Sequence, residues 1–409
     1  MENLAGFPRR EAQAMGLIGF AHMLSHLYML AFAPLAASII SDMQISAIEY
    51  GAALTAFAVV TGILQTPMGL LVERIGGRPI LIFGLFVNSA AFCLIAWFSH
   101  DYLTFIAFMA LAGVGNSVFH PADYSLISAT VAEKRMGRAF SVHTFVGHVG
   151  FILGPILAAG LEPFIGWRGS IATIGIIGVS MSIVLILFGS VIADGNLIKR
   201  SASVRDSLRE LFSSRPVALF FLFYMLSSMA NFGMVQFSVL AFQPLYGIEH
   251  VVAVAALTAY QVGTLALVIP GGILADRTSR YDFIMLLGFG ISSVAILIAG
   301  SGWFPFFIVT ILICIAGGMR GGVNASRDVA VRQIAGRIPV GTVFAFVSTG
   351  FLVGQALSGF IYGFLFEHYP PNFIFYASAA FSILGMVTVI FNQGTRNTKK
   401  ALGDKISTP

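Results

Sequence analysis

The chain has 409 residues, of which 57% are hydrophobic and only 10% are charged, and its mean hydropathy is +0.89. A soluble domain usually has about a quarter charged residues. So few charges cannot cover a soluble core of this size, which excludes a soluble protein and predicts a surface that faces the lipid bilayer. The net charge of +5 does not indicate a nucleic-acid partner, because the basic residues lie in short gaps between apolar runs.

The apolar runs predict an all-α integral membrane protein. A helix needs roughly 20 apolar residues to cross a bilayer. The first run is too long for the core of a signal peptide, so we expect it to be retained. The runs are continuous rather than alternating, which excludes an outer-membrane barrel. On this basis we expect twelve transmembrane helices, near residues 13–40, 49–72, 79–98, 102–130, 139–160, 169–193, 216–243, 251–275, 282–300, 304–331, 340–366 and 372–392.

The positions of the basic residues predict the orientation of these helices. Of the 23 Lys and Arg residues, twenty lie on the side of the membrane that would hold both termini, and only Arg168 lies in the opposite loops. Lys and Arg are enriched in cytoplasmic loops. We therefore expect a multi-pass protein of a bacterial-type inner (plasma) membrane with both termini in the cytoplasm. Arg320 and Arg327 fall inside a predicted span.

A repeat divides the chain into two halves. The sequence GLLVER at 69–74 recurs as GILADR at 272–277, and both copies follow a predicted span. Copies in the same orientation indicate parallel repeats, which place a cavity between the halves. The predicted organisation is a six-helix half at 1–193, a basic cytoplasmic linker at 194–215, a second six-helix half at 216–392 and a cytoplasmic tail at 393–409.

The segment GLLVERIGGR at 69–78 resembles the signature of the major facilitator superfamily, Gly-x-Leu-x-Asp-Arg-x-Gly-Arg-Arg/Lys. Glu73 and Gly77 depart from it. The resemblance implies two parallel six-helix repeats that work by alternating access. Acids and arginines at helix ends suit a conformational latch between cytoplasmic helix ends, although they could also serve topology alone. The candidate latch residues are Glu73, Arg74, Arg78, Asp276 and Arg277.

A second stretch, GVGNSVFHPA at 113–122, is similar to fosmidomycin-resistance-type transporters. Gly150 and Gly154, followed by proline, also resemble the span-five motif of drug–proton antiporters, from which Ser141 departs. These resemblances imply export driven by proton exchange. Close helix packing is a sufficient explanation for a stripe of small residues such as Gly147, Gly150 and Gly154.

Ionisable residues inside a bilayer are costly and are candidates for function. The spacing of Arg320, Asn324, Arg327 and Asp328 places them on one stripe of a helix. Arginine cannot lose its charge in a protein, so this stripe is suited to bind a carboxylate or phosphonate. For Arg327, neutralisation by Asp328 is an equally good explanation.

Histidines and an aspartate occupy the first half. His22 and His26 share one helix face, and His120 and Asp123 share another, whereas His143 and His148 point about 140° apart. Because Asp123, His120 and His143 can change charge, we expect them to couple transport to protons. His120 could instead bond a carbonyl freed by Pro121. No metal site or cofactor is predicted, since His-x-x-x-His is a weak ligand pattern.

The sequence thus predicts a secondary transporter rather than an enzyme or channel, acting as a monomer with protons and a small-molecule substrate as partners. We expect proton-coupled export of a small anionic or zwitterionic organic solute. The alternatives are uptake of an organic anion or anionic metal chelate, or metal-ion transport through the histidines. The candidate substrate-binding residues are Arg320, Arg327, Asn324, His22, His26, Tyr28, Gln236, Gln261 and Gln355.

Overall fold

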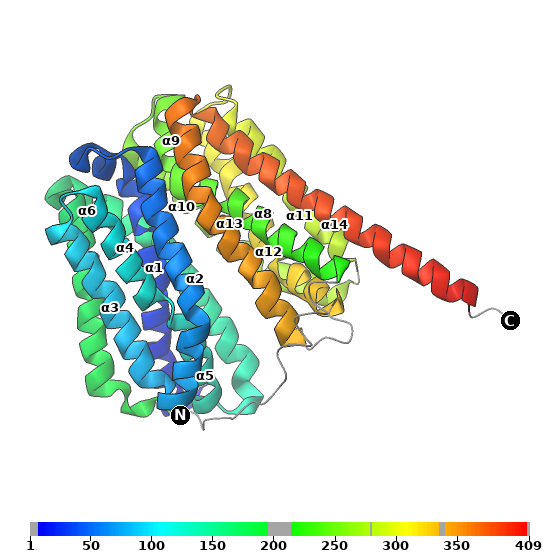
Figure 1. The fold of residues 1–409 in the computed structure, drawn as a ribbon, viewed down its shortest axis with the longest axis horizontal. Coiled ribbons are helices and arrows are strands. Elements are labelled where there is room, and N and C mark those ends of the chain that lie inside the picture. Colours follow the sequence, from blue (N-terminus) through cyan, green and yellow to red (C-terminus); the bar gives the residue numbers. More distant parts are fainter. Residues whose placement is uncertain (1–6, 195–213, 279, 335–339, 407–409) are drawn as a thin grey trace. The chain divides into compact units, whose positions relative to one another are not determined.

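The described part of the chain is almost entirely helical (Figure 1). The computed structural model describes residues 7–194, 214–278, 280–334 and 340–406. Most of the predicted linker, together with the side chains of the predicted tail, lies outside this part. The helices are α1 (Arg9–Met43), α2 (Ala47–Ile75), α3 (Gly77–Phe98), α4 (Tyr102–Asn116), α5 (Phe119–Thr130), α6 (Met136–Phe188), α8 (Arg215–Phe232), α9 (Ser238–Tyr246), α10 (His250–Arg277), α11 (Tyr281–Gly300), α12 (Phe306–Ile334), α13 (Val340–His368) and α14 (Asn372–Ile406), with short 3₁₀ turns η1 (Glu133–Arg135) and η2 (Gly189–Val191).

The described residues contain eleven helical segments that are long and apolar enough to cross a membrane. One of them, Arg138–Val191, contains most of α6 and covers the two spans predicted at 139–160 and 169–193. Gly166 interrupts α6 with φ 68° and ψ 173°, a backbone conformation that glycine adopts without strain. Counting the two arms of α6 separately gives the twelve predicted crossings, so the expected all-helical membrane fold is confirmed.

In two predicted spans the α-helix is interrupted. The fourth divides into α4 and α5, with Pro121 in the first turn of α5, where its missing N–H costs no hydrogen bond. The seventh contains a single π-helical turn, η3 (Gly233–Phe237), between α8 and α9. Turns of this kind occur frequently at functional sites. Both breaks lie in helices that carry polar residues of the candidate site.

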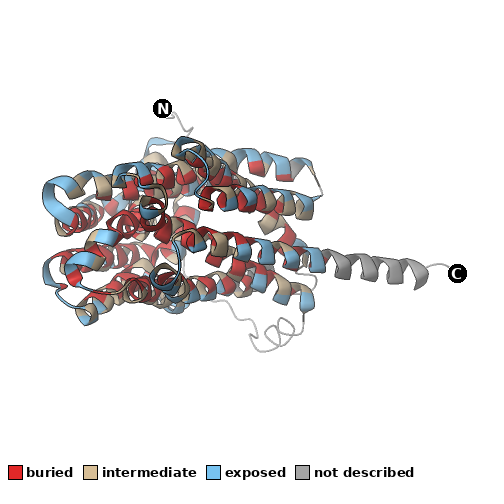
Figure 2. Cartoon of the chain, turned by 90° about the horizontal axis from the view of Figure 1, so that it is seen from above, coloured by how far each residue is buried: buried red, intermediate tan, exposed pale blue. Residues whose placement is uncertain are grey.

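The chain forms two compact units. The first comprises Met1–Arg200 with Gly359–Glu367, and the second comprises Ser201–Ser358 with His368–Pro409. Figure 2 shows that buried residues occupy the faces on which helices pack together. The exposed faces carry large apolar side chains such as Leu103, Phe164 and Phe307. An apolar exterior of this kind suits contact with lipid chains.

Close helix contacts repeat between the two halves. A Cβ atom on Gly113 of α4 would lie 2.6 Å from the carbonyl oxygen of Phe57 in α2. The residues about 203 positions further along the chain behave in the same way, because a Cβ on Gly317 of α12 would lie 2.0 Å from the carbonyl oxygen of Tyr260 in α10. Small residues allow such backbone approach between membrane helices. The repeat read from the sequence therefore extends to the packing inside each half.

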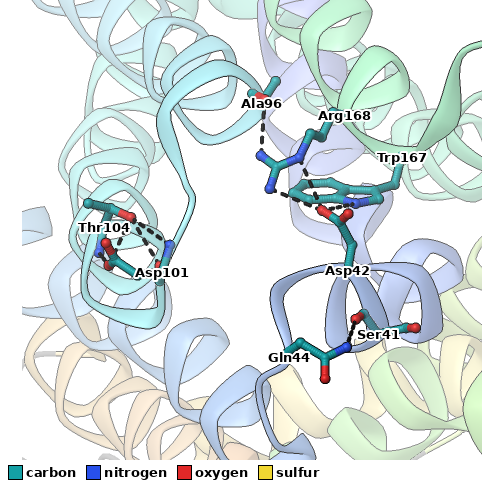
Figure 3. A network of polar contacts seen from close by, with 8 residues as sticks. All are labelled: Ser41, Asp42, Gln44, Ala96, Asp101, Thr104, Trp167 and Arg168. Atoms are coloured by element: carbon teal, nitrogen blue, oxygen red, sulfur yellow. Dashed lines mark hydrogen bonds and ion pairs between the residues drawn. The ribbon is translucent and has the colours of Figure 1, made fainter.

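A polar network joins α1, α3 and α6 at the bend of α6 (Figure 3). Asp42 Oδ2 accepts hydrogen bonds from Trp167 Nε1 and Arg168 Nε, both at 3.2 Å. Arg168 Nη1 also donates to the carbonyl oxygen of Ala96 at 3.2 Å. These contacts fix the residues after Gly166 against the ends of two neighbouring helices.

Asp101 caps the start of α4 (Figure 3). Its Oδ1 accepts a hydrogen bond from the backbone N–H of Thr104 at 2.8 Å. Hydrogen bonds to the charged form favour it, and they hold the pKa of the Asp101 carboxyl below its ordinary value of 3.8. The ionised Asp101 side chain is thus the N-cap that stabilises the first turn of α4.

Candidate functional site

A buried aspartate forms the centre of the titratable groups in the first unit. Asp123 lies on α5 and its side chain is 0% exposed. Its Oδ2 is 2.9 Å from Nδ1 of His22 on α1 and 3.7 Å from Nε2 of His143 on α6. Both imidazoles are also buried. Three helices therefore bring one carboxylate and two imidazoles together, and no arginine is paired with this carboxylate in the described part of the chain.

Further histidines surround this group. The His22 ring stacks on His143 with centroids 3.8 Å apart, and it lies 4.5 Å from the His26 ring and 5.7 Å from that of exposed His120. His148 is half-buried, and its Nδ1 lies 2.9 Å from the carbonyl oxygen of Thr144 within its own helix. His143 and His148 consequently have different surroundings, as their spacing predicted.

The glycine stripe of α6 makes room for these rings. A Cβ on Gly147 would lie 2.8 Å from Cδ2 and Nε2 of His22, and one on Gly150 would lie 2.1 Å from the carbonyl oxygen of Met23. A Cβ on Gly154 would approach the carbonyl oxygen of Leu27 to 2.7 Å. The expected packing role of this stripe is confirmed, and the absence of a side chain at Gly147 also leaves room for the His22 ring.

Six buried polar atoms of Asp123 and its neighbouring histidines lack hydrogen-bond partners among the described residues. Both Asp123 oxygens, both His143 ring nitrogens and Nδ1 of His22 and His26 are buried without one. The 2.9 Å distance between His22 and Asp123 is within ion-pair range, but the angles do not suit a hydrogen bond. Buried polar atoms without partners are rare in folded proteins. A bound proton or cation would supply the missing partner for these atoms.

In the second unit, Arg320 of α12 is buried and only partly hydrogen-bonded. Its Nη2 donates to the carbonyl oxygen of Ser227 on α8 at 2.6 Å and to the Ser227 hydroxyl at 3.3 Å. Its guanidinium carbon lies 5.1 Å from the ring centre of Phe289 on α11. Nη1 is buried without a partner among the described residues. One edge of this cation therefore has no hydrogen-bond partner among the described residues.

Arg327, two turns further along α12, is neutralised by its neighbour. Its Nε donates to Asp328 Oδ1 at 2.9 Å, and the same oxygen accepts a hydrogen bond from the Tyr224 hydroxyl at 3.2 Å. The guanidinium carbon also lies 4.9 Å from the ring centre of Tyr224. The observed contacts match the neutral-pair alternative for Arg327 and leave Arg320 as the better candidate for an anion.

Other polar residues of the second unit lie on the helices around this stripe. The Tyr260 hydroxyl donates to Oδ1 of Asn231 at 2.8 Å. Gln236 and Gln261 are buried, and Asn324 and Gln355 are half-buried. Tyr28 belongs to the first unit, where it is 1% exposed and its hydroxyl lies 2.7 Å from the Ser89 hydroxyl. Tyr28 is thus a core side chain already bonded to α3.

Part of the candidate latch has contacts within the first unit. The backbone N–H of Arg78 donates to Asp194 Oδ1 at 2.7 Å, and its Nη1 donates to the carbonyl oxygen of Gly189 at 3.3 Å. Asp194 is a partner that the sequence analysis missed, because it lies 116 residues away. Glu73, Arg74 and Arg277 are exposed. The side chain of Asp276 lies outside the described residues.

Comparison with known proteins places this architecture in a family. The model of the Major Facilitator Superfamily matches residues 18–259 and 246–406. The chain belongs to this superfamily. This superfamily member is therefore a secondary transporter and not an enzyme.

Sequence relatives match the transporter over part of its length. The probable L-galactonate transporter of Escherichia coli (strain K12) is 29% identical over 175 residues, which are 43% of this chain and 38% of that protein. The multidrug resistance protein MdtH of Yersinia enterocolitica is 24% identical over 107 residues, covering 25% of this chain and 26% of MdtH. The matched region thus spans well under half of either relative.

Solved structures match the transporter over almost its whole length. A bacterial homologue of the human lysosomal transporter Spinster, in an inward-facing and occupied conformation, has a TM-score of 0.77 at 14% identity and covers 95% of this chain and 98% of its own. A variant of the nucleoside transporter NupG has a TM-score of 0.76 at 12% identity, with 93% and 99% covered. At these identities the likeness concerns the fold alone.

Proposed function

We propose that this transporter carries a small anionic or zwitterionic organic solute and that Arg320 binds its carboxylate or phosphonate group. The observation that carries the proposal is the buried Nη1 of Arg320, which has no partner among the described residues. Leaving a buried charge unpaired costs several kcal/mol. A bound anion would complete this group, and a guanidinium matches the two oxygens of a carboxylate.

Charge and polarity narrow the solute further. Because Asp328 neutralises Arg327, the stripe supplies one uncompensated positive charge, which fits a single anionic group. Asn231, Tyr260 and Gln261 supply hydrogen-bonding groups on neighbouring helices of the same unit. The solute in the name of the Escherichia coli relative, galactonate, is a carboxylate with several hydroxyl groups. A small hydroxylated carboxylate is accordingly our preferred substrate class.

Proton exchange at Asp123 is proposed to drive the transport. The carboxylate is in contact with His22 from α1 and His143 from α6, and the rings of His26 and His120 lie beside that of His22. None of these groups carries a permanent charge, so the cluster can gain and lose protons. The resemblance to the fosmidomycin-resistance-type and drug–proton antiporter branch supports export as the direction, and one sequence relative, MdtH, is named as a multidrug resistance protein.

The oligomeric state, the membrane orientation and a conformational latch complete the proposed function. The transporter is proposed to be a monomer with both termini in the cytoplasm, oriented by the twenty basic residues on one side. Glu73, Arg74, Asp276 and Arg277 are proposed to act as a latch, whereas Arg78 also ties α3 to the end of the first six-helix half.

Ligand-induced thermal stabilisation tests the anion site. Thermal unfolding is measured on detergent-purified protein with small carboxylates, phosphonates, metal chelates or lipophilic cations. The proteins compared are wild type, Arg320→Ala and Arg332→Ala, a control that removes an exposed arginine of the same helix. A ligand at about 100 times its Kd stabilises the folded state by about 2.7 kcal/mol. We expect a carboxylate or phosphonate to stabilise wild type and Arg332→Ala but not Arg320→Ala.

Two results would contradict the proposal. Retained stabilisation of Arg320→Ala by the same anion would place the anion site elsewhere. Stabilisation of wild type by lipophilic cations alone would make Asp123 and the histidines the substrate site.

A further inference from the structure

The cluster in the first unit has the composition of a metal-binding group. One ligand atom each from His22, Asp123 and His143 lies within 4.8 Å of the other two. The side chains are 3%, 0% and 2% exposed. They come from α1, α5 and α6, so three separate helices converge on one point inside the unit. We infer that His22, Asp123 and His143 bind one divalent transition-metal ion of the zinc or cobalt(II) class.

The spacing of the donor atoms fits such an ion. Zinc binds imidazole nitrogen and carboxylate oxygen at about 2.0 to 2.2 Å, so two tetrahedral ligand atoms lie roughly 3.3 Å apart. The observed separations from Asp123 Oδ2 are 2.9 Å to His22 Nδ1 and 3.7 Å to His143 Nε2, on either side of that value. The third separation, between the ligand atoms of His22 and His143, is within 4.8 Å.

The state of these atoms favours an ion over a structural contact. His22 Nδ1, both Asp123 oxygens and both His143 nitrogens have no hydrogen-bond partner among the described residues. Binding an ion would therefore break no hydrogen bond, and it would supply the partner that buried polar atoms normally have. An ordinary histidine–aspartate contact would instead show hydrogen-bond angles, which this one lacks.

The donor set selects the class of metal. Calcium and magnesium are bound by oxygen ligands, of which this group offers only one carboxylate. Two imidazoles and a carboxylate suit zinc, cobalt(II) and iron(II). A site with three protein ligands also keeps an open position for water or a solute. His26 and His120 lie beside the group, with ring centres 4.5 and 5.7 Å from that of His22.

This inference goes beyond the proposed anion transport and does not rest on Arg320. It holds whichever solute is carried. Because a bound ion would occupy the atoms proposed to carry the coupling proton, binding is measured on detergent-solubilised protein in the absence of transport. Failure of the metal test therefore leaves the thermal test at Arg320 intact, and the reverse is also true.

Cobalt(II) is the probe, because its visible absorption depends on its ligands. Tag-free protein is titrated with Co²⁺ and then with Zn²⁺, which competes for the same imidazole and carboxylate ligands. We expect one Co²⁺ per chain and its displacement by Zn²⁺. Asp123→Asn and His143→Gln should weaken binding by at least about tenfold, the lower range for loss of a group that supports a metal site. The matched control, His148→Gln, removes another α6 histidine and should bind as wild type does.

A further variant separates loss of a ligand from loss of the fold. His143→Cys replaces one metal ligand by another, and a thiolate–cobalt charge-transfer band would place the ion at this position. Size-exclusion profiles and thermal midpoints check that each variant is folded. The inference is overturned if wild type binds neither Co²⁺ nor Zn²⁺, if folded Asp123→Asn binds as tightly as wild type, or if His148→Gln loses binding to the same extent.

Discussion

The two halves of the transporter hold their intramembrane charges in opposite ways. The first half gathers groups that can change charge, His22, Asp123 and His143, from three helices around one carboxylate. The second half places two guanidinium groups on the single helix α12. The repeated helix packing shows that the backbone framework is similar in both. One framework can therefore support either a changeable or a permanent charge, depending on which few side chains point inward.

Stabilisation also differs between the two sites. Arg320 is held by the Ser227 carbonyl oxygen and the face of Phe289, and Arg327 by Asp328 and Tyr224. Both Asp123 oxygens, both His143 ring nitrogens and His22 Nδ1 have no such hydrogen bonds among the described residues. Built-in partners suit a charge that is always present, whereas unpaired atoms suit a proton or ion that comes and goes.

The largest expected effect is loss of coupling in the first half. Asp123→Asn keeps the size of the side chain but removes its ability to become charged. We expect substrate-driven proton movement to fall to the level of protein-free liposomes, while exchange of labelled substrate down its gradient continues. A pH-sensitive dye inside the liposomes measures the proton flux. An unchanged number of protons per substrate would exclude Asp123 from coupling.

The next effect separates the two arginines of the second half. Arg320→Gln should weaken anion binding roughly 30-fold or more, because truncating a buried charge that pairs with a ligand costs about 2 to 5 kcal/mol. The double variant Arg327→Gln/Asp328→Asn removes a neutral pair and should change the affinity by less than about threefold. Calorimetric titration with the stabilising anion compares them. Equal losses in both variants would mean that the stripe binds the anion as a unit.

A smaller effect tests how the first half positions its cluster. Gly147→Ala introduces a methyl group 2.8 Å from the His22 ring, so the imidazole must move. Overpacking of this kind typically costs about 1 to 3 kcal/mol, which thermal unfolding in detergent should detect. Gly160→Ala is the matched control on the same helix, because its Cβ would meet nothing within 4 Å. A destabilisation shared by both variants would point to a general effect on α6.

The smallest effect concerns an acid that belongs to neither site. Because folding lowers the pKa of Asp101, its ionised carboxylate stabilises the folded state at neutral pH. This stabilisation is lost as the pH falls below the unfolded pKa of 3.8 and through the lower pKa of the folded state. Asp101→Ala should slightly lower the thermal midpoint near pH 7 and reduce the further drop in acid. Parallel melting curves of wild type and Asp101→Ala between pH 3 and 7 would differ by a constant amount if the cap made no pH-dependent contribution.

Much of the fold could be predicted from the sequence because a bilayer imposes a simple rule. The apolar runs and the repeated 69–74 and 272–277 segments were sufficient to predict twelve helices in two related halves. The gap predicted between the fifth and sixth spans, 161–168, contains the bend of α6, but its position at Gly166 was not predicted, since glycine is common in membrane helices. The π-helical turn at Gly233–Phe237 likewise has no distinct local pattern.

The site was predictable only as far as contacts along one helix determine it. Arg327 and Asp328 are adjacent in the chain, so their pairing could be weighed in advance. The contact of Arg320 with Ser227 joins α12 to α8, and periodicity within one helix does not contain that information. For the same reason His22 and His26 were grouped by their spacing, whereas the shortest distance to a carboxylate is from His22 to Asp123 on α5.

The bend of α6 has a consequence for how this protein can be cut or labelled. Both arms remain helical up to Gly166, and Arg168 is tied to Asp42 and Ala96 directly after it. Proteases and insertions favour exposed loop tips rather than backbone held in helices. On whichever side of the membrane it lies, this connection should resist digestion, and an epitope tag placed there would disrupt the helix pair instead of extending a loop.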